Sequence, residues 1–151
     1  MDISAGIVKE LRDKTGVSVM ECKKALVAAE GDMDKALKIL QENSAVLVEK
    51  KQDRELGAGT VAAYVHNTGQ VGAMVVLSSE TDFVSKNEEF ISLARDIAMH
   101  VSAMRPVDRD ELVAQPFIKD SSKTIADLLS TATQKFGERI DIKGFSCWSV
   151  K

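Results

Sequence analysis

Hydrophobic residues in the first forty positions recur at the three- and four-residue spacing of amphipathic helices. The first stripe is Ile7, Val8 and Leu11, which follows Ser4 as a helix cap and ends at Gly16. Two later stripes share this spacing: Cys22, Ala25, Leu26 and Ala29, then Met33, Ala36, Leu37 and Leu40. The pattern therefore predicts three short helices that pack as a small bundle.

Polar residues and glycines mark the limits of the second and third helices. Ser18 and Glu21 have the spacing of a capping box, in which each side chain bonds a free backbone amide. Gly31 ends the second helix and Asp32 caps the third. Helices this short would make only a marginally stable domain by themselves.

The chain changes composition between residues 44 and 58. Residues 45–48 are apolar, residues 49–55 are mostly charged, and Gly57 and Gly59 follow. We interpret this stretch as an extension of the third helix that becomes a flexible joint. The predicted domains are a three-helix bundle over 1–43, a helical or flexible connector over 44–58, and an α+β core over 59–151.

Alternating residues after the connector predict a β-hairpin. Residues 60–66 alternate, with Val61, Ala63 and Val65 on one face. Residues 67–70 have the composition of a turn, and residues 71–77 resume as a strand.

A long amphipathic helix follows this hairpin. A capping box at Ser85 and Glu88 starts it, Phe90 and Ile97 lie on its apolar face, and it stops before Pro106. The remaining chain predicts a short helix capped by Asp108, an extended segment over 115–118, a helix over 125–136 and a strand over 139–150. The expected core is α+β, a small three-stranded antiparallel sheet with helices packed on one face.

Composition and charge restrict the kind of partner. The chain has 20 basic and 23 acidic side chains and no concentrated basic region, which argues against nucleic-acid binding. No apolar run approaches the roughly 20 residues of a membrane span, and no signal-peptide pattern begins the chain. Cys22 and Cys147 lie far apart, as suits a reducing compartment. We expect a cytoplasmic protein whose partner is a protein or a small molecule.

No sequence motif predicts catalysis. Phosphate-binding loops, dinucleotide fingerprints, zinc-protease motifs and hydrolase nucleophile elbows are missing from the sequence. His66 and His100 have no neighbouring partners in sequence, so each is expected to be a structural or surface residue. Cys147 stands beside Trp148 in a strand, where a buried inert thiol is expected. The sequence therefore predicts no catalytic residue, no metal ligand and no cofactor.

Asp82 and Phe83 stand at the junction between the hairpin and the long helix. Phe83 has two interpretations: it folds under Phe90, or it anchors a partner protein. A hydrophobic staple around Ser85 would pair Val84 with position 89, which is a glutamate, so no apolar pair forms. Burying a phenylalanine in a partner is worth roughly 1.5–3 kcal/mol, the scale of an interface hot spot.

Basic side chains gather in the first two predicted helices, at Lys9, Arg12, Lys14, Lys23 and Lys24. They form either a solvated face or a contact for an acidic partner, and the sequence leaves both open. The arrangement of three short helices resembles a ubiquitin-associated bundle, a type that mostly binds other proteins.

Several segments occur in order along nearly the whole chain. They are residues 11–26 (LRDKTGVSVMECKKAL) with Glu30-Gly-Asp32, then Thr81-Asp-Phe-Val84 and Ile97-Ala-Met-His100, supported by Gln115-Pro-Phe-Ile118 and Gly137-Glu-Arg-Ile140. Together they resemble the translation elongation factor Ts family. A lone Thr-Asp-Phe-Val would be a weak match, whereas the ordered set is specific.

The resemblance implies a nucleotide-exchange factor for the GTPase elongation factor Tu. The factor would bind the GTPase in both its GDP form and its nucleotide-free form. The residues it implies for the wedge near the Mg²⁺ and phosphate site are Thr81, Asp82, Phe83 and Val84. Those it implies for docking of the bundle on the G domain are Arg12, Lys14, Thr15, Gly16, Met20, Lys23 and Lys24.

The chain departs from the common family pattern in length. Longer members carry a second copy of the core and a helical-hairpin insertion, and here Pro106 passes almost directly to Asp108 and the segment 115–118. Short members are thought to act as dimers, so we expect a homodimer or a weaker, partial contact. The strand from Arg139 and the edge of the hairpin are the predicted self-pairing sites. A hypothesis of a different class is a ubiquitin-like or nascent-chain binding adaptor that uses the bundle alone.

Overall fold

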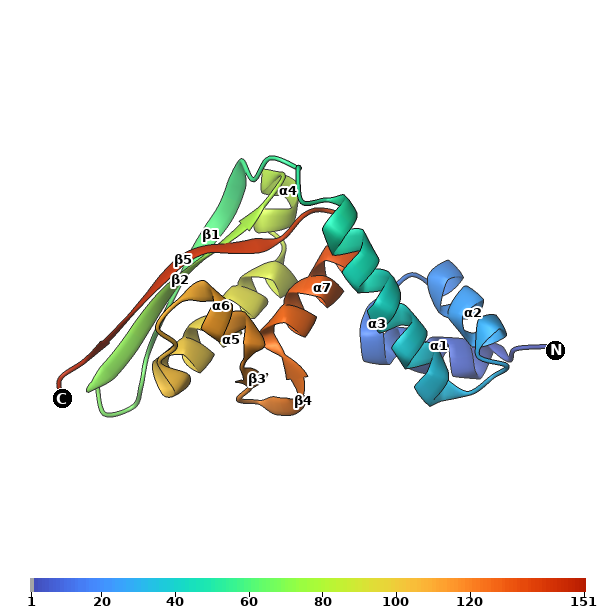
Figure 1. Ribbon diagram of the computed structural model, residues 1–151, viewed down its shortest axis with the longest axis horizontal. Helices are drawn as coiled ribbons and strands as arrows, with labels where there is room; N and C mark the ends of the chain where they lie inside the picture. Colours follow the sequence, from blue (N-terminus) through green and yellow to red (C-terminus); the bar gives the residue numbers. More distant parts are fainter. Residues whose placement is uncertain (1) are drawn as a thin grey trace. The chain divides into compact units, whose positions relative to one another are not determined.

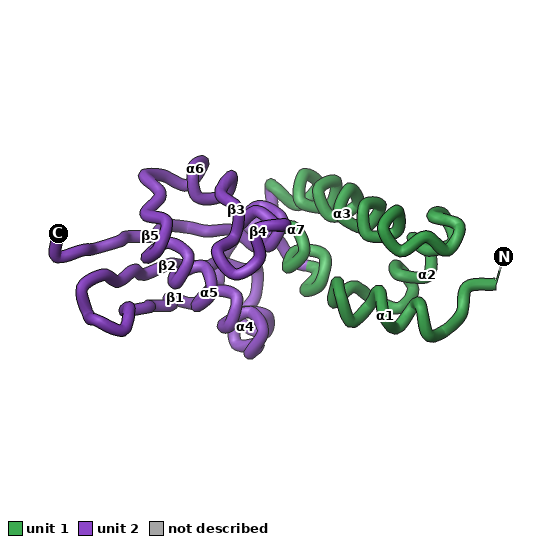
Figure 2. The backbone as a smooth tube through the Cα atoms, turned by 90° about the horizontal axis from the view of Figure 1, so that it is seen from below, with its two compact units in different colours: residues 1–52, 130–137 green, residues 53–129, 138–151 purple. Residues whose placement is uncertain are grey.

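The computed structural model describes residues 2–151, and the chain divides into two compact units. The first unit runs to Gln52 and also contains Ser130–Gly137, and the second contains Asp53–Leu129 and Glu138–Lys151. Figure 2 shows the first unit in green and the second in purple. The domain limits expected from the sequence stay a prediction, because two compact units are not by themselves two segments that fold independently.

Three helices begin the first unit: α1 (Ala5–Thr15), α2 (Val19–Ala28) and α3 (Met33–Lys50). The predicted caps are confirmed, since the side chains of Ser4, Ser18 and Asp32 accept hydrogen bonds from backbone amides three residues later. Gly16 ends α1 at a φ of 71°, a conformation that favours glycine. Local sequence therefore sets all three helix starts.

The core of this bundle contains most of the predicted stripes, although Ile7, Met33 and Leu37 are only partly buried. Leu11, Cys22 and Leu26 are fully buried, and other members of the cluster are Val8, Val17, Ala25, Ala29, Ala36 and Leu40. Burial raises the pKa of the Cys22 thiol, which keeps it protonated.

Helix α3 is one continuous helix to Lys50, so the first part of the predicted connector is helical. Within the first unit, Ser44 on α3 is buried and donates a hydrogen bond to Gln134 of helix α7 (Ile125–Phe136). Lys51 Nζ donates to the carbonyl of Gly137 at 3.0 Å. Carbonyl groups at the end of a helix such as α7 have no donor within the helix and need one from elsewhere. The last residues of α7 thus complete the bundle, which the sequence pattern did not reveal.

The second unit contains a three-stranded antiparallel sheet in the order β1-β2-β5. Its strands are β1 (Ala58–Val65), β2 (Val71–Ser79) and β5 (Asp141–Ser149). Helix α5 (Glu88–Met104) lies along one face and contacts all three strands, as Figure 1 shows. The predicted α+β class with helices packed on one face of the sheet is confirmed.

Two short helices and a second small sheet complete this unit. They are α4 (Asp82–Ser85), α6 (Arg109–Ala114), and the strands β3 (Pro116–Phe117) and β4 (Asp120–Thr124), which pair antiparallel. Asp108 caps α6 through the amide of Glu111, as predicted. The sequence predicted an extended segment at 115–118 but not its partner strand, whose residues are all polar.

The sheet buries one face of β1 and exposes the other. Ala62 is 6% exposed and faces α5, whereas Val61 and Val65 are 59% and 66% exposed. Val61, Ala63 and Val65 do share a face, as the alternation predicted, and that face points away from α5. In the part of the chain that the structure describes, no helix is long and apolar enough to cross a membrane.

His100 is a buried structural residue of α5. Its Nδ1 accepts the backbone N–H of Ile118 at 3.2 Å, which leaves Nε2–H to donate to Gln115 Oε1 at 2.9 Å. The ring therefore ties the segment around β3 to α5. Burial lowers the pKa of His100, because the charged form would lose its hydration.

This burial predicts that the protein is less stable in mild acid. The fold favours neutral His100, so its contribution is complete above pH 6.5, the ordinary pKa, and falls as pH drops toward the lowered folded-state pKa. The free energy of unfolding should lose up to about 1.4 kcal/mol per pH unit in that window. Urea unfolding at pH 7.5, 6.5 and 5.5 measures this loss in the free energy of unfolding. His100→Gln should reduce the dependence of the unfolding free energy on pH, whereas His66→Gln, at an exposed histidine, should keep it. An equal pH dependence in the two variants would contradict the assignment to His100.

Candidate functional site

The junction after β2 forms the single helical turn α4, which exposes Phe83. Phe83 is 91% exposed, while Phe90 in α5 is completely buried. The interpretation in which Phe83 folds under Phe90 is therefore wrong for this structure. Its apolar ring stands in solvent beside the carboxylate of Asp82, which is also exposed.

The turn is attached to the fold through its second half. Val84 and Ser85 are each 6% exposed, and α4 contacts β1, β2 and α5. Of the four residues predicted for the wedge, Thr81, Asp82 and Phe83 are exposed and Val84 is an anchor in the core.

The predicted capping box at Ser85 and Glu88 is wrong. Ser85 belongs to α4, and its hydroxyl donates to the carbonyl of Asp82 at 3.2 Å. Asn87 caps α5 instead, with its side chain accepting the amide of Glu89 at 2.8 Å. The cap moves because the turn of α4 continues through Ser85, and the chain becomes extended again only at Asn87.

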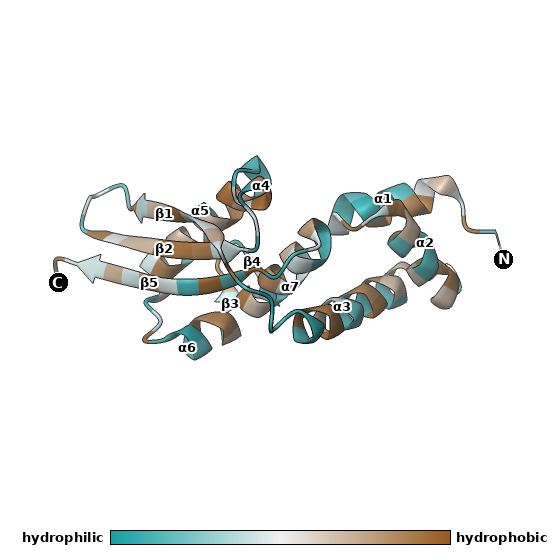
Figure 3. Cartoon of the chain, turned by 90° about the horizontal axis from the view of Figure 1, so that it is seen from above, coloured by the Kyte–Doolittle hydropathy of each residue, from teal (hydrophilic) through white to brown (hydrophobic). Residues whose placement is uncertain are grey.

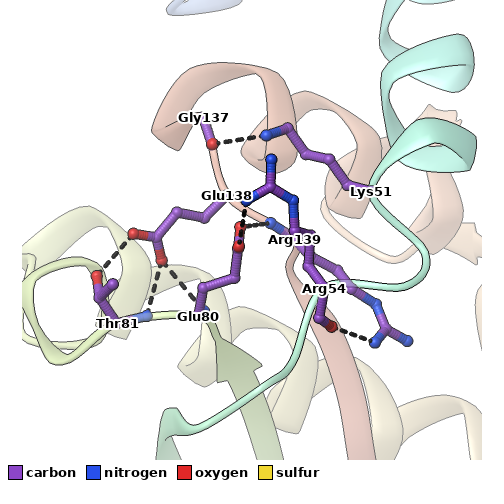
Figure 4. Close-up of polar contacts among 7 residues, drawn as sticks. All are labelled: Lys51, Arg54, Glu80, Thr81, Gly137, Glu138 and Arg139. Carbon is purple, nitrogen blue, oxygen red and sulfur yellow. Dashed lines mark hydrogen bonds and ion pairs between the residues drawn. The ribbon is translucent and has the colours of Figure 1, made fainter.

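A glutamate distant in sequence holds the start of this turn (Figure 4). Glu138 Oε1 accepts the backbone amides of Glu80 and Thr81 at 3.1 and 3.0 Å, and Oε2 accepts the Thr81 hydroxyl at 2.6 Å. Glu80 in turn accepts the backbone amide of Arg139 at 2.7 Å. The two glutamates thus join the end of β2 to the segment before β5 from both sides.

Two arginines complete this cluster. Arg54 Nη1 lies 3.7 Å from Glu80 Oε1, and Arg139 Nη1 donates to the carbonyl of Arg54 at 2.8 Å. Arg139 Nη2 also lies 3.7 Å from a carboxylate oxygen of Asp141. Arg54 thus pairs with Glu80 and Arg139 with Asp141, on either side of the base of α4.

Sequence reasoning gave no role to these supporting residues. Glu138 and Arg139 occur within the Gly137-Glu-Arg-Ile140 segment that supports the family resemblance, and this was the one available signal. Their partners lie 57 to 85 positions away, which no periodic pattern indicates.

The residues predicted for docking lie on α1, α2 and the turn between them. Two shallow hollows lie beside them: Arg12 and Lys23 line one of about 320 Å³, and Met20, Lys23 and Lys24 line another of about 370 Å³. Met20 is 66% exposed, and Val19 and Val27 on the same helix are also exposed. This gives an apolar surface bordered by lysines.

The other predicted docking residues do not line these hollows. Lys14 pairs with Glu10 at 3.0 Å, and the Thr15 hydroxyl donates to the carbonyl of Leu11 at 2.8 Å. Gly16 is the exposed end of α1. The structure therefore gathers Arg12, Met20, Lys23 and Lys24 and gives Thr15 and Gly16 local roles in ending the helix.

The described residues contain no cluster of metal-ligating side chains. Cys147 is partly exposed rather than buried as predicted, because it lies on an edge strand of the sheet. An exposed aromatic beside a carboxylate, on a turn fixed from both sides, is the geometry of a protein-interaction element. This turn and the apolar surface of α2 are therefore the two candidate sites for contact with another protein.

Comparison with known proteins identifies the family. A family model described as "Elongation factor TS" matches residues 3–106 and 80–151. Elongation factor Ts of Alkaliphilus oremlandii is 36% identical over 195 residues, with 99% of this chain and 90% of the relative covered. Elongation factor Ts of Thermodesulfovibrio yellowstonii is 36% identical over 194 residues, with 99% of this chain and 97% of the relative covered. The chain belongs to the elongation factor Ts family, whose members serve translation elongation.

The relatives differ in length from this chain. Since the chain has 151 residues, the relatives aligned over 194 or 195 residues carry stretches with no counterpart in it. Elongation factor Ts of Trichlorobacter lovleyi is 40% identical over 150 residues, which are 99% of this chain and 48% of the relative.

Proposed function

We propose that this protein promotes release of GDP from elongation factor Tu. The observation that carries the proposal is Phe83, which is 91% exposed on a braced turn beside Asp82. An apolar ring that is held rigidly in solvent gains free energy only when another molecule covers it. Family membership identifies the partner class.

The proposed mechanism uses the two exposed surfaces in different ways. The surface of α2 with Arg12, Met20, Lys23 and Lys24 docks on the G domain of the GTPase. Asp82 and Phe83 then insert near the Mg²⁺ and phosphate site. Mg²⁺ and the phosphate-binding loop hold GDP through charge and oriented amides, so displacing their support weakens nucleotide binding.

Linkage makes this effect reciprocal. The factor weakens nucleotide binding by the same ratio as nucleotide weakens factor binding. Entry of GTP therefore expels the factor and lets it act again in the cytoplasm. In this role the protein is an exchange factor without catalytic side chains of its own.

We further propose that two copies of the chain associate through the open face of the sheet. This face carries Val61, Val65, Met74 and Trp148, which are 50–76% exposed. In the register of the sheet, Val65 pairs with Gly72 and Gly72 with Trp148, so these residues share one side. Figure 3 shows the strands in front of α5, with hydrophobic residues coloured brown.

The experiment that tests the exchange function is release of a fluorescent GDP analogue from elongation factor Tu. The rate with this protein should exceed the spontaneous rate and saturate with factor concentration. The whole chain with Asp82→Ala and Phe83→Ala should bind elongation factor Tu without accelerating release, because the surface of α2 is intact and the wedge is missing. Binding of elongation factor Tu by the wild-type chain, with no acceleration of release, would favour the adaptor hypothesis instead.

A further inference from the structure

Thr81 stands at the cap position of α4, yet its side chain makes no capping bond within the turn. Its hydroxyl instead donates to Glu138 Oε2 at 2.6 Å. The amides at the cap and just before it, those of Thr81 and Glu80, find their acceptor outside the local sequence. The group that satisfies this end of the junction therefore comes from a residue 57 positions away.

A single carboxylate satisfies three donors at this point. Glu138 Oε1 accepts the amides of both Glu80 and Thr81, and Oε2 accepts the hydroxyl (Figure 4). Bonds to an ionised acceptor are about twice as strong as neutral ones, and negative charge is favourable at the start of a helical turn. Glu138 thus fixes the direction in which the chain leaves β2 and enters α4.

Glu138 is itself held in place by contacts of the residue that follows it, just before β5. The next residue, Arg139, donates its amide to Glu80 Oε2 at 2.7 Å, and its guanidinium donates to the carbonyl of Arg54 at 2.8 Å. Glu80 is mostly buried, with 16% of its side chain exposed, so it cannot swing away freely. The three hydrogen bonds that Glu138 accepts from Glu80 and Thr81 form a clamp, which is therefore anchored to the segments next to β2 and β5.

The turn needs this clamp because it is too short to be stable alone. A helix of four residues forms at most one turn, and helix nucleation is unfavourable without outside contacts. Val84 and Ser85 anchor its second half, but Phe83 contributes no burial. Without Glu138, the first half would be free to sample other conformations, and binding would have to order it.

We infer that Glu138 is a positioning residue that holds Asp82 and Phe83 in the conformation that acts on the GTPase. This inference rests on the proposed exchange function and assigns the residue that keeps its acting element preorganised. Docking through α2 does not involve Glu138, so its removal should change the maximal rate of release rather than the factor concentration at half-saturation.

The test compares variants in release of a fluorescent GDP analogue from elongation factor Tu across factor concentrations. Glu138→Ala should lower the maximal rate about tenfold, since it removes three charge-assisted bonds, and leave half-saturation unchanged. Glu138→Gln should recover most of the rate, because an amide oxygen still accepts both backbone amides. Glu111→Ala is the matched control, since Glu111 also accepts a backbone amide, that of Val107 at 2.8 Å, away from α4.

Amide hydrogen exchange supplies a readout that does not depend on the GTPase. The amides of Glu80 and Thr81 should exchange faster in Glu138→Ala and remain protected in Glu138→Gln and Glu111→Ala. A Glu138→Ala protein with the wild-type maximal rate, or one that Glu138→Gln fails to rescue, overturns the positioning role. If the wild-type protein does not accelerate GDP release, the proposed function fails. If wild type accelerates release and Phe83→Ala is slow while Glu138→Ala is normal, only the role of Glu138 fails.

Discussion

Replacing Phe83 with alanine is expected to slow GDP release from elongation factor Tu about 10- to 100-fold at saturating factor. Burial of a phenylalanine side chain is worth roughly 1.5–3 kcal/mol, and each 1.4 kcal/mol changes a rate tenfold. The whole burial energy of Phe83 appears in the rate if the ring becomes buried only as GDP leaves. Such a contact lowers the activation barrier of GDP release and does not change the affinity of the factor for the GTPase. Stopped-flow fluorescence of a labelled GDP measures the rate.

The fold should be unaffected by this substitution. Phe83 is 91% exposed, so its removal leaves no cavity, and the melting temperature should match wild type. Val107→Ala is the matched control, because Val107 is an apolar side chain that is 85% exposed in the same unit. Equal rates for the two variants would remove the wedge from the mechanism.

The exposure of Phe83 was one of the two interpretations that the sequence left open, and the local sequence favoured it. The position that a staple would have used is Glu89, and Phe90 already occupied the apolar face of α5. The same local logic located the caps at Ser4, Ser18, Asp32 and Asp108. Capping is a contact between residues three positions apart, so the sequence contains all that it needs.

Other features depended on contacts that the sequence does not display. Ser85 and Asn87 are both good caps, and the choice between them was made by the extent of α4. Alternation in β1 predicted a strand but did not decide which face is buried, because both faces carry small or apolar residues. Packing of α5 on the side of Ala62 decided it.

The support of the candidate site was hidden for the same reason. Glu138 follows the end of α7 and, by sequence, is one more acidic residue near a glycine. Its three donors lie on residues 80 and 81, so only the antiparallel pairing of β2 with β5 brings them together. A residue that acts by holding another is therefore the kind that sequence patterns miss.

The open face of the sheet predicts a second large effect, on the state of association. Met74 lies in the central strand and is 50% exposed, with Ala63 and Ser146 as its register partners. A charge at this position would have to be buried in a dimer formed through this face, and an unpaired buried charge costs several kcal/mol. Met74→Glu should therefore be monomeric where wild type is dimeric.

Light scattering coupled to size exclusion measures this directly, with the dimer at twice the chain mass of 16.4 kDa. Ile118→Glu is the matched control, because Ile118 is 48% exposed and lies outside the three-stranded sheet. It should remain dimeric and melt like wild type. Met74→Glu should stay folded, since the side chain is half exposed in one chain, and should melt lower than wild type only by the stabilisation that dimerisation adds.

Exchange activity connects the two effects. If the second copy supplies surface that longer relatives carry in one chain, Met74→Glu should need more factor for half-saturation while its maximal rate stays close to wild type. Phe83→Ala should show the opposite, a lower maximal rate at unchanged half-saturation. A wild-type protein that is monomeric at tens of micromolar, or a Met74→Glu variant that remains dimeric, would rule out association through this face and leave the role of Phe83 intact.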